Sequence, residues 1–257
     1  MATAPKATGP LTITELNAET ITFTIVGRTP LIINKLSNKA KHELLLPRGR
    51  KTTAEKALSL KHDPVQEFRD SVYVDRDPDS PTLLVMPATT IKKAMGLAAM
   101  RSDSGAKLTK AKFLQLSWAE GVNFSVYGIP KLFMAIARTA DVPDVRTRAI
   151  VEEWCAEVTM TFLKPELHAK AMLQLAQNAG LLSGIGDWRP EKGSGTYGQF
   201  SVAMADDPRV QYLRANCGRD AQVEAMAAAE EFDEDTAELM AWFDTEVNDR
   251  GKRDLIA

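Results

Sequence analysis

Residues 182–202, LSGIGDWRPEKGSGTYGQFSV, are the stretch from which the fold of the chain is best predicted. A helix-like run precedes them, and Tyr197, Phe200 and Val202 alternate at their end as residues of a strand do. Because glycine tolerates positive φ and lets a backbone or a ligand come close, the stretch predicts a glycine loop between a helix and a strand. The glycines of this loop are Gly184, Gly186, Gly193, Gly195 and Gly198.

The same loop carries side chains of the kinds that contact nucleic acids. Trp188 and Tyr197 are suited to stacking on bases, and Arg189 and Lys192 to pairing with phosphates. The loop therefore predicts a nucleic-acid-binding site. The alternative interpretation is a tight structural turn that carries a surface aromatic residue.

The composition is that of a soluble globular protein. The 257 residues are 44% hydrophobic and 26% charged, enough for one large domain or two small ones. No apolar run approaches the roughly 20 residues of a membrane span, and the first ten residues lack the apolar core of a signal peptide, so we expect a cytoplasmic protein. With two cysteines and three histidines, we expect no disulfide framework, no metal centre and no cofactor.

The charge is distributed unevenly along the chain. Residues 219–257 hold 12 acidic and 4 basic side chains, so this segment carries about −8 and the rest of the chain about +6. A strongly basic stretch spans residues 35–61. Clustered lysines and arginines favour phosphate contact, whereas the alternative is a solvated loop. The residues of this stretch that we predict to bind nucleic acid are Lys41, Arg48, Arg50 and Lys51.

Two further segments predict anion contacts. Residues 83–101, LLVMPATTIKKAMGLAAMR, predict a strand that ends at a proline and is followed by a helix. Lys92 and Lys93 lie near the first turn of this helix, where free backbone N–H groups attract anions. Residues 145–162 show the longest alternating strand pattern. Arg146 and Arg148 precede its apolar face at strand spacing and would reach the same ligand, whereas Trp154 continues that face and is expected in the core.

The order of strands and helices predicts the α+β class. It is compatible with a ferredoxin-like, RRM-like βαββαβ core that carries basic insertions and a C-terminal acidic helical segment. We expect three parts: a flexible N-terminal arm (1–19), a nucleic-acid-binding domain (20–210) with an insertion at 35–80, and the acidic helical segment (211–257).

Two stretches resemble the RAMP superfamily, particularly the backbone subunits of CRISPR effector complexes. Residues 85–94, VMPATTIKKA, resemble the start of that superfamily's first helix, although Ala88 replaces a glycine and Lys93 a small residue. The pattern of glycines in residues 184–200 resembles its C-terminal glycine-rich loop. Residues 188–192, WRPEK, also look like those of phage-encoded proteins, which implies a phage relative acting in the host cytoplasm.

The resemblance implies an RRM-like sheet, single-stranded RNA or DNA bound along a basic groove, and head-to-tail assembly into a homo-oligomer or filament. Our leading hypothesis is therefore a non-catalytic single-strand-binding protein. One alternative is a metal-independent endoribonuclease of RAMP type, for which the candidate catalytic residues are His42, His62 and Asp63. The other is an interaction or inhibitor subunit that binds a protein partner through the acidic segment.

Overall fold

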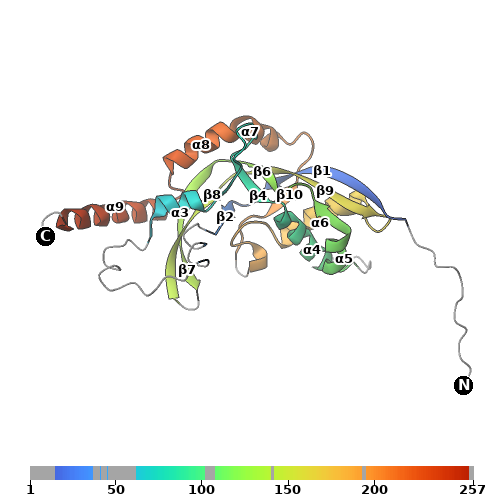
Figure 1. Cartoon of the computed structure of the whole chain (residues 1–257), viewed down its shortest axis with the longest axis horizontal. Coiled ribbons are helices and arrows are strands. Elements are labelled where there is room, and N and C mark those ends of the chain that lie inside the picture. Colours follow the sequence, from blue (N-terminus) through green and yellow to red (C-terminus); the bar gives the residue numbers. More distant parts are fainter. Residues whose placement is uncertain are drawn as a thin grey trace, which may run out of the picture.

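The computed structural model describes residues 15–36, 41, 45, 62–101, 108–139, 142–192 and 195–254. They form a mixture of helices and antiparallel strands (Figure 1), which confirms the expected α+β class. The strands are β1 (Asn17–Gly27), β2 (Leu31–Ile33), β3 (Tyr73–Val74), β4 (Leu84–Pro87), β5 (Ser117–Ala119), β6 (Asn123–Tyr127), β7 (Pro130–Thr139), β8 (Val142–Val151), β9 (Cys155–Lys164) and β10 (Phe200–Val202). The helices are α3 (Pro64–Asp70), α4 (Thr89–Arg101), α5 (Lys110–Leu116), α6 (Ala169–Leu182), α7 (Pro208–Asn216), α8 (Arg219–Ala228) and α9 (Glu234–Asp254).

The strands are arranged in two sheets. The larger sheet has the order β10-β1-β9-β6-β4-β3, and β5 also pairs with β9. The smaller sheet has the order β2-β8-β7. Its long hairpin, β7 and β8, extends away from the body in Figure 1. Every pairing between these strands is antiparallel.

The centre of the larger sheet has one apolar and one polar face. Phe23 and Ile25 of β1 and Met160 of β9 are buried in the main core, together with apolar residues of α4 and α6. On the opposite face threonines pair across the two strands: the Thr20 and Thr161 hydroxyls lie 2.7 Å apart, and those of Thr22 and Thr159 2.9 Å. The sequence ETITFTIVG (residues 19–27) alternates apolar residues with threonines, which predicts a strand with one buried side, and the two faces of β1 are separated accordingly.

The long alternating stretch at 145–162 differs from its prediction, because it forms two strands and not one. β8 ends at Val151 and β9 begins at Cys155, and the exposed Glu152 and Glu153 lie in the turn between them. Trp154, predicted to be in the core, is 1% exposed. Its indole Nε1 donates a hydrogen bond to the Thr29 carbonyl at 3.0 Å, so this buried polar atom has a partner.

Two helices differ from what their sequences predict. The pattern of residues 165–180, PELHAKAMLQLAQNAG, predicts a helix from Pro165, but α6 begins at Ala169, with His168 at its N-cap position. The polar residues up to 112 predict a loop, and those from Phe113 a strand, but residues 110–116 form α5. Thr109 caps α5 by accepting a hydrogen bond from the Lys112 amide at 3.1 Å.

The C-terminal helices pack onto the sheets through specific hydrogen bonds. Gln222 of α8 is fully buried. Its Oε1 accepts from the amides of Leu83 (2.8 Å) and Leu84 (2.9 Å), and its Nε2 donates to the carbonyls of Val126 (2.8 Å) and Gly128 (3.0 Å). One amide side chain thus joins α8 to the start of β4 and the end of β6. The division of the chain into arm, domain and acidic segment stays a prediction.

Candidate nucleic-acid interface

The glycine loop folds back onto itself and onto β2. The Ile185 amide donates to the Gly198 carbonyl at 2.9 Å, and the Asp187 amide donates to the Ile32 carbonyl at the same distance. Gly186 has a φ of 81°, and a Cβ there would lie 2.5 Å from the Ile32 oxygen. Only glycine meets both conditions, so the close approach at this position is to the protein's own backbone.

Trp188 and Tyr197, both half-buried, pack together on the smaller sheet. Their ring centroids are 6.2 Å apart, and both rings contact Phe133 of β7. The Arg148 guanidinium lies 5.8 Å from the centre of the Trp188 ring and pairs with the Asp187 carboxylate. Burial lowers the pKa of Arg148, and the Asp187 charge opposes that shift. We call these five residues the aromatic cluster.

A small pocket of about 240 Å³ lies where α4, the glycine loop and the end of β2 meet. Lys93 and Arg189, two of the predicted phosphate-binding residues, both line it. The pocket thus joins segments that are far apart in the sequence. We call it the lysine pocket, and its lining is Asn34, Tyr73, Met86, Thr90, Lys93, Ala94, Gly184, Ile185, Gly186, Arg189 and Glu191.

The cations around the lysine pocket differ in how firmly they are held. Arg189 donates to the Gly186 carbonyl at 2.7 Å, and its Nε donates to Glu191 at 2.9 Å, so its charge is partly neutralised. Lys35 lies over the Tyr73 ring, 5.9 Å from its centre. Lys93 is exposed and forms no ion pair within the part of the chain that the structure describes.

A hydrogen bond links the lysine pocket to the aromatic cluster. Asn34 lines the pocket, and its Nδ2 donates to the Asp187 carboxylate at 3.1 Å, which in turn pairs with Arg148. The sequence interpretation did not include Asn34, Tyr73, Asp187 or Glu191. Asn34 and Asp187 are polar residues beside β2 and in the glycine loop, but only the fold shows that those two segments meet.

The other predicted binding residues are dispersed. Lys92 is half-buried on α4, the exposed Lys192 ends the short 3₁₀ turn 190–192, and Arg146 pairs with Asp144 at 3.2 Å on β8. Gly195 packs under Trp188, since a Cβ there would lie 1.7 Å from the Trp188 oxygen. Lys41 is half-buried. The predictions that fall outside the described residues are Arg48, Arg50, Lys51, His42 and Gly193.

The histidine of the ribonuclease alternative has both ring nitrogens in contact with carboxylates. His62 Nδ1 lies 2.8 Å from Glu67, and its Nε2 lies 3.2 Å from Asp144. Asp63 caps α3 by accepting from the Gln66 amide at 3.1 Å. His62 therefore joins α3 to β8, Asp63 caps α3, and catalysis by either residue stays a prediction.

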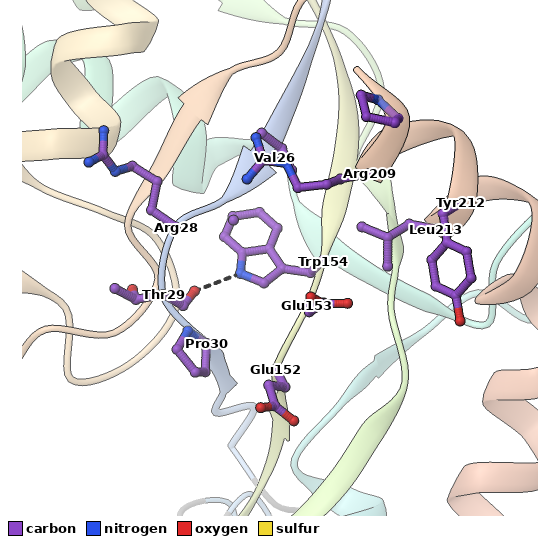
Figure 2. A pocket seen from close by; sticks show the side chains of 12 residues that line it. Val26, Arg28, Thr29, Pro30, Glu152, Glu153, Trp154, Arg209, Tyr212 and Leu213 are labelled. Carbon is purple, nitrogen blue, oxygen red and sulfur yellow. Dashed lines mark hydrogen bonds between the residues drawn. The ribbon is translucent and has the colours of Figure 1, made fainter. Parts of the chain in front are cut away.

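A larger hollow, of about 580 Å³, lies between the end of β1, the β8–β9 turn and α7 (Figure 2). Figure 2 shows Trp154 in its middle, with the bond to Thr29 drawn. Its rim carries both charge signs, Arg28 and Arg209 against Glu152 and Glu153. Arg209 is already held by Asp207 at 2.9 Å. Two arginines are balanced by two glutamates here, whereas the lysine pocket has Lys93 and Arg189 against Glu191 alone, so the hollow is the poorer phosphate site.

The described residues contain neither a cluster of metal ligands nor a helix fit to span a membrane. No group of three or more histidine, cysteine, aspartate or glutamate side chains there is arranged to hold a metal ion. No helix of the described part combines the length and apolar character needed to cross a membrane.

Comparison with known proteins gave structural neighbours only. No family model matches the sequence, and no curated protein matches it. The crystal structure of Cmr6 from Pyrococcus furiosus matches with a TM-score of 0.36 and 11% identity, over 73% of this chain and 98% of that one. A chain from the cryo-EM structure of the Type III-B Cmr-beta bound to cognate target RNA matches with a TM-score of 0.37 and 13% identity, over 73% of this chain and 59% of that one. The structural neighbours are thus RAMP-type CRISPR proteins, at low TM-score and identity.

Proposed function

We propose that this protein binds single-stranded nucleic acid, RNA or DNA, at the lysine pocket and along the aromatic cluster beside it. The observation that carries the proposal is the meeting of Lys93, Arg189 and the glycine loop at one small pocket. Lys93 and Arg189 come from two segments, residues 83–101 and 182–202, whose sequences each predict anion binding. The fold brings these two segments together.

A phosphate group in the lysine pocket would meet three favourable features. Thr90 and Lys93 lie near the start of α4, a helix of 13 residues with no acidic residue in its first turn, so the positive end of its dipole is uncompensated by side chains. Lys93 supplies a full positive charge. Arg189 is held in place by Gly186 and Glu191, which reduces the entropy lost on binding.

Bases of the bound strand would stack on aromatic rings beside the pocket. Tyr73 is half-buried and lines the pocket, and Trp188 is half-buried in the neighbouring cluster. Stacking of this kind tolerates any sequence, because every base has a π face. The proposal therefore includes little base specificity and, as in the sequence interpretation, no catalysis.

The strand order offers a reason for the position of the pocket. We propose that β1, α4, β5, β9, α6 and β10 form the ferredoxin-like unit, since their strands lie in the order β10-β1-β9-β5 and are all antiparallel. In that topology the two helices run antiparallel, so the start of the first lies beside the end of the second. The lysine pocket lies between the start of α4 and the loop after α6. On this proposal, β2–β4 and β6–β8 are insertions into the unit.

The proposal is tested by fluorescence anisotropy with labelled single-stranded RNA, single-stranded DNA and duplex DNA at low salt. We expect binding to both single strands and weaker binding to the duplex. Lys93→Ala and Arg189→Ala should each weaken binding. Arg28→Ala is the matched control, because Arg28 is an exposed arginine on the rim of the larger hollow. Equal losses in Arg28→Ala and Lys93→Ala, or no binding at all, would show that the pocket is not the site.

A further inference from the structure

The larger hollow, between the end of β1, the β8–β9 turn and α7, plays no part in the proposed nucleic-acid binding. Its volume of about 580 Å³ is more than twice that of the lysine pocket and lies in the range of cavities that hold ligands. Trp154, Val26 and Leu213 form its floor and are at most 3% exposed. A ligand would therefore touch mainly the walls, whose exposed side chains are Arg28, Glu152, Glu153, Pro208, Arg209 and Tyr212.

The turn that carries the two glutamates is held firmly in place. Gly128, which follows β6, has a φ of 146°, and a Cβ there would lie 2.5 Å from the Glu153 carbonyl oxygen, so the turn rests directly on backbone. Beside the turn, the Gly27 amide donates to the Trp154 carbonyl at 2.8 Å, and the Trp154 indole donates to the Thr29 carbonyl at 3.0 Å. The hollow is thus formed before a ligand binds, which reduces the entropy lost on binding.

The charges of the walls become unequal once the internal ion pair is counted. Arg209 donates to the Asp207 carboxylate from Nε at 3.2 Å and from Nη2 at 2.9 Å. The Glu153 charge also raises the pKa of Arg209, but it contributes less than the bond to Asp207. Arg28, Glu152 and Glu153 form no ion pair with any other residue that the structure describes. One positive and two negative charges therefore remain, which give the hollow an excess of negative charge.

The unpaired carboxylates lie on the same side of the hollow as an accessible aromatic ring. Tyr212 is 59% exposed. Figure 2 shows Tyr212 and Glu153 on one side of the Trp154 indole and Arg28 on the other. An aromatic face beside a carboxylate suits a planar cation, because a guanidinium can lie flat on the ring and donate two parallel hydrogen bonds to the carboxylate.

We infer that the larger hollow binds an arginine side chain of a partner protein, presented on a short apolar segment. The guanidinium would lie on the Tyr212 ring and pair with Glu152 or Glu153, and the flanking apolar side chains would cover Pro30 and Pro208. Two carboxylates repel a phosphate backbone, so the ligand is a polypeptide and not a nucleic acid. The inference does not rest on the proposed nucleic-acid binding, since it uses a different cavity.

The test is a titration of the nitrogen-15-labelled full chain with a peptide, followed by two-dimensional NMR. The probe is Ser-Leu-Arg-Leu-Ser blocked at both ends, so that the guanidinium is its only charge. We expect a saturable shift of the indole N–H signal of Trp154, while the signals of the other three tryptophans stay in place. The same peptide with lysine should bind more weakly, and the uncharged peptide with citrulline about 10-fold more weakly or worse.

Variants of the walls decide whether the arginine binds where we infer. The double variant Glu152→Gln/Glu153→Gln should weaken binding of the arginine peptide about 10-fold, and Tyr212→Leu roughly 3-fold. The control is Glu224→Gln, an exposed glutamate of α8 outside the hollow, which should change nothing. The remaining signals of each spectrum report whether the variant is folded.

Four outcomes would each overturn the inference. They are no saturable binding of millimolar arginine peptide, equal binding of the arginine and citrulline peptides, equal losses in Glu224→Gln and in the double variant, and displacement of the peptide by an equal concentration of spermidine. The last result would mean that the hollow attracts any cation and does not recognise an arginine on a polypeptide.

Discussion

Replacing Gln222 by leucine should destabilise the protein more than the same replacement of any other glutamine among the described residues. Leucine has a similar volume and keeps the side chain apolar in a fully buried position. It cannot, however, hydrogen-bond the amides of Leu83 and Leu84 or the carbonyls of Val126 and Gly128. The substitution thus isolates the polar contribution from the packing contribution.

The expected cost follows from the number of groups that lose a partner. A buried backbone group left without its hydrogen bond costs about 1–3 kcal/mol. Gln222 also donates to the Cys217 carbonyl at 3.2 Å, but that carbonyl still accepts from the Gly128 amide, so four groups lose their partner. At the low end of that range, we expect a loss of about 4 kcal/mol in the free energy of unfolding. That is a large share of the roughly 5–15 kcal/mol that stabilises an ordinary domain.

Urea denaturation followed by circular dichroism measures this cost against two matched controls. Gln177→Leu removes one hydrogen bond, from the Val202 amide at 2.9 Å, and should cost about 1 kcal/mol. Gln174→Leu removes an exposed contact to Asn178 and should change stability by less than about 0.5 kcal/mol. If Gln222→Leu costs no more than Gln177→Leu, the account of α8 as joined to the sheet by this amide is refuted.

Three further predictions concern the site and the core. Gly186→Ala should cost about 2 kcal/mol or more by urea denaturation and should weaken single-strand binding, because a Cβ at φ 81° meets backbone; unchanged stability would contradict the loop geometry. Asp187→Ala should cost about 2 kcal/mol by leaving Arg148 unpaired and mostly buried, and a double-mutant cycle with Arg148→Met should show coupling, whereas additive losses would contradict the pairing. Burial raises the pKa of the Cys155 thiol to about 11 and also raises the pKa of Cys217, so stability from the buried thiols is present below about pH 9 and falls as pH rises toward 11. Iodoacetamide at about pH 8 should label neither cysteine until urea unfolds the protein, and rapid labelling of the folded chain would contradict this burial.

The sequence predicted the central pair of strands well, because alternation reports directly which face is buried. Phe23 and Ile25 lie inward and Thr22 outward as expected, and Trp154 lies in the core. The same reasoning failed at residues 145–162. The alternation is interrupted at residues 149–153, AIVEE, where β8 ends and the chain turns into β9, and the prediction missed this interruption as a strand boundary.

The candidate site could be predicted only in part. Lys93 and Arg189 follow from local rules, since each lies in a segment with its own anion-binding features. Their meeting in one pocket depends on how α4 and α6 cross, which no local pattern encodes. Trp188 illustrates the opposite case, because an aromatic residue in a glycine loop suggests a ligand, while the fold packs its ring on Phe133.

The most direct test of the proposed function is the salt dependence of binding to a single-stranded RNA of fixed length. For the unaltered protein, the logarithm of the association constant should fall linearly with the logarithm of salt concentration. Lys93→Ala should make that slope shallower by about 0.7, the value for one phosphate contact to a single strand, while Arg28→Ala leaves it unchanged. A slope near zero, or one that Lys93→Ala does not change, would contradict phosphate binding at the lysine pocket.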